Sequence, residues 1–111
     1  MKLSTLKKKY PKAFKKCFGI IYVDGDIREE WKEITGFMDG RGIIIIIKLD
    51  TLSDKFYYEI YDKKENWEAE ILELGNDETK RSIAETLAIE TSFKILENRI
   101  NEREKKWNYR A

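Results

Sequence analysis

The chain has no histidine and a single cysteine, Cys17. Without histidine it lacks the commonest metal ligand and the usual general base at neutral pH. One cysteine excludes an intramolecular disulfide and a zinc site built from several cysteines. The longest aliphatic run, Ile43 to Ile47, is far shorter than the ~20 residues of a membrane helix, and the lysine-rich N-terminus has no signal-peptide hydrophobic region. We therefore expect a cytoplasmic protein with no membrane association and no cofactor.

Positive and negative charges are segregated along the chain, although the formal net charge is only +1. The first 23 residues contain seven lysines and no acidic residue, whereas residues 43–78 contain ten acidic residues and four lysines. A charge dipole of this kind suits recognition of a charged partner. No catalytic motif accompanies it, so the composition favours a recognition protein rather than an enzyme.

Length and hydrophobic spacing predict one domain, residues 1–111, with helices at both ends. A short helix from Ser4 should break or restart at Pro11, which lacks an N–H group. A second helix should run from a cap at Asp26 to Gly40. A long third helix should run from a cap at residue 76 or 77 toward residue 106.

The segments between these helices predict strands. Residues 43–49 are continuously apolar, which predicts a central strand covered on both faces. Residues 55–62 alternate and predict a half-exposed strand, and residues 67–74 predict a third strand with a bulge or a helical turn near its end. A short fourth strand is an option for residues 18–23. The expected fold is α+β: a mainly antiparallel sheet of three or four strands, two short N-terminal helices and a long C-terminal helix.

An acidic surface with interleaved aromatic residues is expected on the outer face of this sheet. Tyr57, Glu59 and Tyr61 alternate along one strand, and Glu68 and Glu70 alternate along the next. Regularly placed carboxylates can imitate nucleic-acid phosphates and occupy the basic groove of a nucleic-acid enzyme. Any solvated sheet also carries outward charges, so an ordinary surface is the alternative.

Two apolar stripes run along the predicted C-terminal helix, and a polar row with Arg99 and Arg103 separates them. One stripe is expected to cover the sheet. The other, with Phe93 and Trp107, would then meet a protein partner or a second copy of the chain. The alternative is that the protein's own sheet and first helices bury both stripes. A helix of about 30 residues is ~45 Å long, so its end, with Trp107, should project beyond the domain.

The lysines of the first helix offer an alternative binding surface. Lys8, Lys12 and Lys15 would contact nucleic-acid phosphates without sequence preference, because lysine lacks the arginine fork. A plain solvated helix face would carry the same lysines. Asp24 and Asp26 match a turn and a helix cap better than a metal loop, so no metal site is expected. Cys17 lies on the apolar side of its helix, which predicts a buried, inert thiol.

Three segments of the sequence resemble small uncharacterised proteins of phages that infect Bacteroidetes. They are residues 10–14, from Tyr10 to Phe14; the helix and Gly-Ile strand of residues 27–47; and Ala84 to Ile89 followed by residues 93–97. Phage proteins of this size include anti-CRISPR and other anti-defence inhibitors. The resemblance implies a non-enzymatic inhibitor that binds a host defence protein, such as a CRISPR nuclease, through the acidic sheet face and the C-terminal helix. The rival expectation is a small nucleic-acid-binding accessory protein that uses the lysine-rich helix.

Overall fold

The computed structural model describes residues 1–19, 24–63, 69–74 and 80–110. Its elements follow in the order α1 (Leu3–Lys9), α2 (Pro11–Phe18), the 3₁₀ helix η1 (Ile27–Glu30), α3 (Trp31–Gly40), β1 (Ile43–Asp50), β2 (Lys55–Lys63), β3 (Ala69–Leu74) and α4 (Arg81–Arg110). The predicted α+β class, with an antiparallel sheet and a long C-terminal helix, is confirmed.

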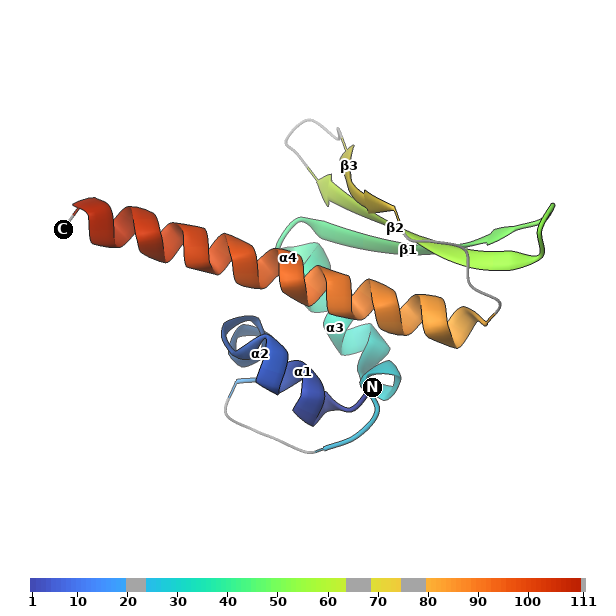
Figure 1. The fold of residues 1–111 in the computed structure, drawn as a ribbon, viewed down its shortest axis with the longest axis horizontal. Coiled ribbons are helices and arrows are strands. Elements are labelled where there is room, and N and C mark those ends of the chain that lie inside the picture. Colours follow the sequence, from blue (N-terminus) through green and yellow to red (C-terminus); the bar gives the residue numbers. More distant parts are fainter. Residues whose placement is uncertain (20–23, 64–68, 75–79, 111) are drawn as a thin grey trace.

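The helices lie on one side of the sheet (Figure 1). α4 runs across β1 and β2, α3 contacts β1, and α1 and α2 lie beyond α4. The break expected at Pro11 is present, because α1 ends before this residue and α2 begins with it. The other face of the sheet carries no element of the described chain (Figure 1). The core therefore has a sheet layer, a layer with α4 and α3, and the N-terminal helices beneath.

β2 lies between the other two strands, with antiparallel pairing to β1 on one side and to β3 on the other. In the second pairing Ile60 faces Glu73 and Tyr61 faces Ile71, so Leu72 has no partner residue. This bulge falls where the apolar alternation of the sequence changes phase. Residues 64–68, which the third predicted strand included in part, lie outside the described residues, as do residues 20–23 of the optional fourth strand.

The prediction of a central strand at residues 43–49 is wrong. β1 is at the edge of the described sheet, and only one of its faces packs against helices. Ile43 on the inner face is fully buried, whereas Ile46 on the outer face is 37% exposed and Leu49 at the strand end is 47% exposed. A continuous isoleucine run is typical of a doubly covered strand, but here it supplies an apolar outer face as well.

Both apolar stripes of α4 are buried within the protein except at the end of the helix, where Trp107 of the second stripe is 75% exposed. Ala88 lies in the core on the sheet side, where Thr91 and the Tyr58 hydroxyl share a hydrogen bond of 3.1 Å. Ile89 and Phe93 are fully buried as well, because α1 and α2 cover α4 on the side away from the sheet. The prediction that Phe93 belongs to a partner interface is therefore wrong: this side chain is part of the core.

α2 is held at its N-terminus by a carboxylate of α4. The Tyr10 side chain caps nothing, and Pro11 occupies the first helical position. The next two backbone N–H groups, of Lys12 and Ala13, donate to Glu97 at 3.4 and 2.7 Å. The first N–H groups of a helix have no partner inside the helix, so Glu97 serves as a cap that is distant in sequence.

Replacing Glu97 by alanine is expected to lower the free energy of unfolding by about 1–2 kcal/mol, the upper range for loss of a helix cap. Urea denaturation followed by circular dichroism measures this change. Glu102→Ala, at an exposed position of the same helix, is the matched control and should change stability by less than about 0.5 kcal/mol. Equal stability of the two variants would contradict the capping role.

Candidate functional site

The outer face of the sheet is open and mainly apolar and aromatic. Register pairs place Ile44 opposite Tyr61, Ile46 opposite Glu59 and Lys48 opposite Tyr57. All six residues lie on the same face because side chains alternate along a strand. Ile46 is exposed, and Ile44, Tyr57 and Tyr61 are half-buried without any helix over them. This set is called the outer face below.

Glu59 does not present a free carboxylate on this face. It is only 7% exposed, its Oε1 lies 2.9 Å from Lys48 Nζ, and its Oε2 accepts a hydrogen bond from the Tyr61 hydroxyl. The hydrogen bond to Glu59 raises the pKa of Lys48. The prediction of Glu59 as an exposed acidic contact is therefore wrong, because its charge is neutralised by a neighbour on the adjacent strand. Glu68 lies outside the described residues, and the Glu70 side chain does too.

The free edge of β1 adjoins the outer face. Lys63 N–H donates to Gly42 C=O at 2.8 Å, which sets the alternation of the β1–β2 ladder. The backbone groups of Ile44 and Ile46 then point toward β2, and those of Ile45 and Ile47 point to the opposite edge. In the described part of the chain no backbone hydrogen bond reaches Ile45 or Ile47 from that side.

A hollow of about 320 Å³ lies along this edge. It is lined by Thr35, Gly36 and Asp39 of α3 and by Ile44 and Ile45 of β1. Consecutive strand residues point to opposite faces, so a hollow that touches both Ile44 and Ile45 lies at the edge of the strand rather than over one face. The unpaired backbone and the hollow thus occupy the same place.

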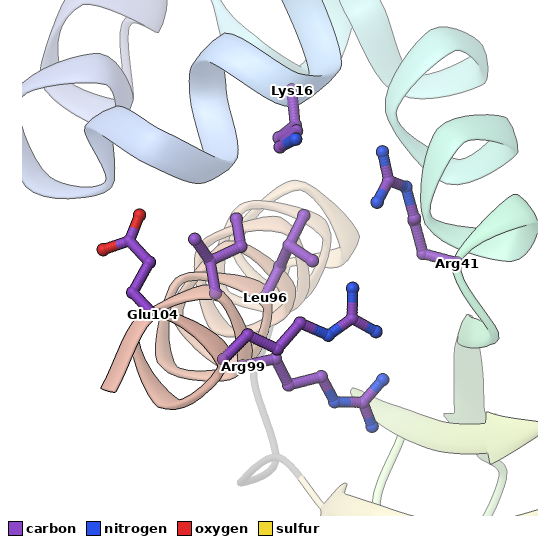
Figure 2. Close-up of a pocket in the computed structure, with 7 residues that line it drawn as sticks. Lys16, Arg41, Leu96, Arg99 and Glu104 are labelled. Carbon is purple, nitrogen blue, oxygen red and sulfur yellow. The ribbon is translucent and has the colours of Figure 1, made fainter. Parts of the chain in front are cut away.

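A second hollow gathers four cationic side chains. Lys16 of α2, Arg41 directly after α3, and Arg99 and Arg103 of α4 line a pocket of about 270 Å³. Figure 2 shows Lys16, Arg41 and Arg99 around one space, each from a different part of the chain. Its remaining lining residues are Leu96, Ile100 and Glu104. We call this group the basic pocket.

The basic pocket unites two predicted site residues, Arg99 and Arg103, with two that the sequence analysis missed. Lys16 was one of seven lysines in the N-terminal segment, and Arg41 stands between two glycines in the turn before β1. No spacing rule relates these positions to α4, because they meet only through the packing of α2, α3 and α4. Arg99 also lies 3.5 Å from Asp62 of β2.

The lysine-rich helices are partly committed to internal contacts. Lys12 Nζ lies 2.6 Å from both Glu104 and Asn101 of α4, and Lys9 Nζ lies 3.0 Å from Glu90. Lys12 is therefore not a free cation, because its ammonium group pairs with Glu104 of α4, and its predicted contact with nucleic acid stays a prediction. Lys8 and Lys15 are exposed, and their role stays a prediction.

The end of α4 projects from the domain, as the helix length predicted (Figure 1). Trp107 on this end is 75% exposed. The side chains from Glu102 to Lys106 are exposed as well. The projecting end of α4 is on the opposite side of the sheet from the outer face (Figure 1). Its contact with a partner stays a prediction.

Cys17 is half-buried and unsuited to nucleophilic chemistry. Burial, with smaller contributions from Glu33 and Glu30, raises the pKa of its thiol to about 12. Within residues 1–19, 24–63, 69–74 and 80–110, no group of three or more acidic, cysteine or histidine residues is placed to hold a metal ion. No described helix is both long and apolar enough to cross a membrane.

No protein family, curated protein or solved structure matches this chain. The resemblance to phage proteins therefore stays a prediction.

Proposed function

We propose that this protein is a non-enzymatic binding protein that pairs the free edge of β1 with an extended segment of a partner protein. The observation that carries this proposal is the run of backbone groups at Ile45 and Ile47 that no described residue pairs with, beside the hollow at α3. A row of N–H and C=O groups at a strand edge can form hydrogen bonds with the backbone of another extended segment. The occupant is therefore a strand of the partner.

The character of β1 supports strand addition. Edge strands that must stay unpaired are normally short, bulged, or interrupted by proline or several charges. β1 has eight residues and continuous pairing to β2 without a bulge, and its first five residues are all isoleucine. On the outer face, Ile44 and Ile46 of β1 would lie directly beside an added strand, and Tyr57 and Tyr61 of β2 lie one strand further away. An added strand would thus gain backbone hydrogen bonds and apolar contacts together.

A bacterial defence protein such as a CRISPR nuclease, the partner class that the phage resemblance implies, is the first candidate for this strand. The defence protein would be inhibited because the segment paired with β1 could no longer perform its normal function. This binding does not depend on imitation of nucleic-acid phosphates, since the Glu59 carboxylate is paired with Lys48. The contact is formed by backbone and apolar groups.

Amide hydrogen exchange tests the free edge in the isolated protein. The amides of Ile44 and Ile46 donate into the β1–β2 ladder and should exchange slowly, whereas those of Ile45 and Ile47 should exchange at least about tenfold faster. Uniformly slow exchange along β1 in a monomer would contradict the free edge. Uniformly slow exchange along β1 in a concentrated sample, together with a doubled scattering mass, would show that a second copy of the chain occupies the edge.

Binding is tested by a substitution that removes one outward donor. Ile45→Pro deletes an N–H that points away from β2, a position where an edge strand tolerates proline. Ile45→Ala removes most of the side chain and keeps the donor, so it is the matched control. We expect the alanine variant to retain partner binding and the proline variant to lose it by at least about tenfold, the loss expected when a partner's buried group is left unpaired.

A partner captured from a bacterial lysate supports the proposal only if this difference is seen and if the Ile45 and Ile47 amides of the alanine control become protected in the complex. Equal binding by the proline and alanine variants, with both folded by circular dichroism, would place the interface elsewhere. Protection confined to the projecting end of α4 would assign binding to Trp107 instead.

A further inference from the structure

The basic pocket brings like charges together at a point where the described chain supplies little compensation. Lys16, Arg41 and Arg103 form no ion pair within the described residues, and Arg41 stacks over the Phe37 ring with 5.2 Å to its centroid. Charges of one sign that converge in a hollow repel one another and raise the local potential. The pocket is therefore prepared for an anion.

Two acids lie near the pocket, and each already forms an ion pair, one with Lys12 outside the pocket and one with Arg99 of the pocket itself. Glu104, which lines it, lies 2.6 Å from Lys12 Nζ on α2. Asp62 offers one oxygen to Arg99 at 3.5 Å, a long contact for a charge-assisted hydrogen bond. After these two pairs are counted, no described residue forms an ion pair with Lys16, Arg41 or Arg103. Three excess charges exceed what one carboxylate would neutralise, and they favour a phosphate group.

We propose that the basic pocket binds the phosphate group of a small phosphate monoester, such as a nucleoside monophosphate. Arginine presents its donors in a planar fork that matches phosphate oxygens, and Lys16 adds a point charge. The apolar side chains of Leu96 and Ile100 lie in the same lining and would contact the organic part of the ester. A volume of about 270 Å³ is near the lower end of small-molecule pockets, about 300 Å³. This site is independent of the β1 edge.

The chemistry of the ligand is tested by titration calorimetry with three probes: inorganic phosphate, adenosine monophosphate and adenosine. We expect adenosine monophosphate to bind, inorganic phosphate to bind more weakly because it forgoes the apolar contacts, and adenosine not to bind. Affinity should fall as salt is raised, since the contacts are between charges. Absence of binding by both phosphate-containing probes at low salt would overturn the proposal.

The position of the site is tested by substitution. Arg41→Gln removes one pocket cation that makes no ion pair with a described residue. It should lower the affinity for adenosine monophosphate at least about tenfold, as expected for loss of a charge-assisted contact. Arg28→Gln makes the same chemical change at an exposed residue that does not line the pocket, and it should leave affinity unchanged. Equal losses in both variants would show a general electrostatic effect and contradict a built site.

The competing ligand is a nucleic-acid strand. An unphosphorylated single-stranded oligonucleotide presents phosphodiesters and no terminal monoester. If it binds as well as adenosine monophosphate, and if Lys8→Gln with Lys15→Gln weakens it while Arg41→Gln does not, the binding surface is the lysine face and the pocket proposal is wrong. Circular dichroism of every variant confirms that folding is intact before these comparisons are made.

Discussion

Replacement of Phe93 by alanine is expected to lower the free energy of unfolding by about 3–5 kcal/mol, the usual cost of removing a buried aromatic side chain. Phe93 is fully buried in the main hydrophobic core. Helices α1 and α2 contribute to that core beside α4, so the cavity left by the ring cannot be filled by a movement of α4 alone.

Urea denaturation of the two proteins measures the loss, and Trp107→Ala supplies the contrast on the same helix. Trp107 is 75% exposed, and its removal should change the unfolding free energy by less than about 0.5 kcal/mol. If the Phe93→Ala protein unfolds like the wild type but no longer associates with a partner, Phe93 is an interface residue and not a core residue.

Cys17 is expected to react with a disulfide reagent roughly 30- to 60-fold more slowly in the folded protein than in the unfolded chain at pH 8. The fold raises the pKa of the thiol from 9.0 to about 12, which lowers the thiolate fraction about a thousandfold. The remaining thiolate is a stronger nucleophile by about 16- to 32-fold, which offsets part of this loss.

Stopped-flow measurement with an aromatic disulfide, in buffer and in urea, provides both rates. Between pH 7 and pH 9 the folded-state rate should rise about tenfold per pH unit, because the thiolate fraction still grows linearly with hydroxide. If the reaction rate of the folded protein equals the rate in urea, the fold neither shields Cys17 nor raises the pKa of its thiol.

The helices were predictable because their apolar positions repeat over several turns, and Pro11 marks the break between α1 and α2. The bulge at Leu72 also left a trace in the sequence, as a change of alternation. These features depend on local order along the chain. The burial of Phe93 was not predictable from local order. Two apolar stripes on α4 indicate two contact surfaces, but the sequence does not distinguish whether the second stripe packs against the protein's own helices or against a partner.

The candidate sites depended on contacts between distant residues. Alternation placed Glu59 on the correct face of β2, but its burial depends on Lys48 of the neighbouring strand. The isoleucine run was recognised as a strand, while its position at the sheet edge is set by the order in which strands pair. Lys16 and Arg41 carried no signal, since only the packing of three helices brings them to Arg99.

The cap that Glu97 places on α2 has a consequence for the order of folding during synthesis. α1 and α2 have seven and eight residues, too few for a stable helix in isolation. The hydrogen bonds to Glu97 span 84 and 85 positions of the chain. α1 and α2 leave the ribosome before α4 and therefore lack their stabilising contacts until α4 has also emerged. These two helices should stay open to proteases and chaperones until then, and the domain should form in one late step.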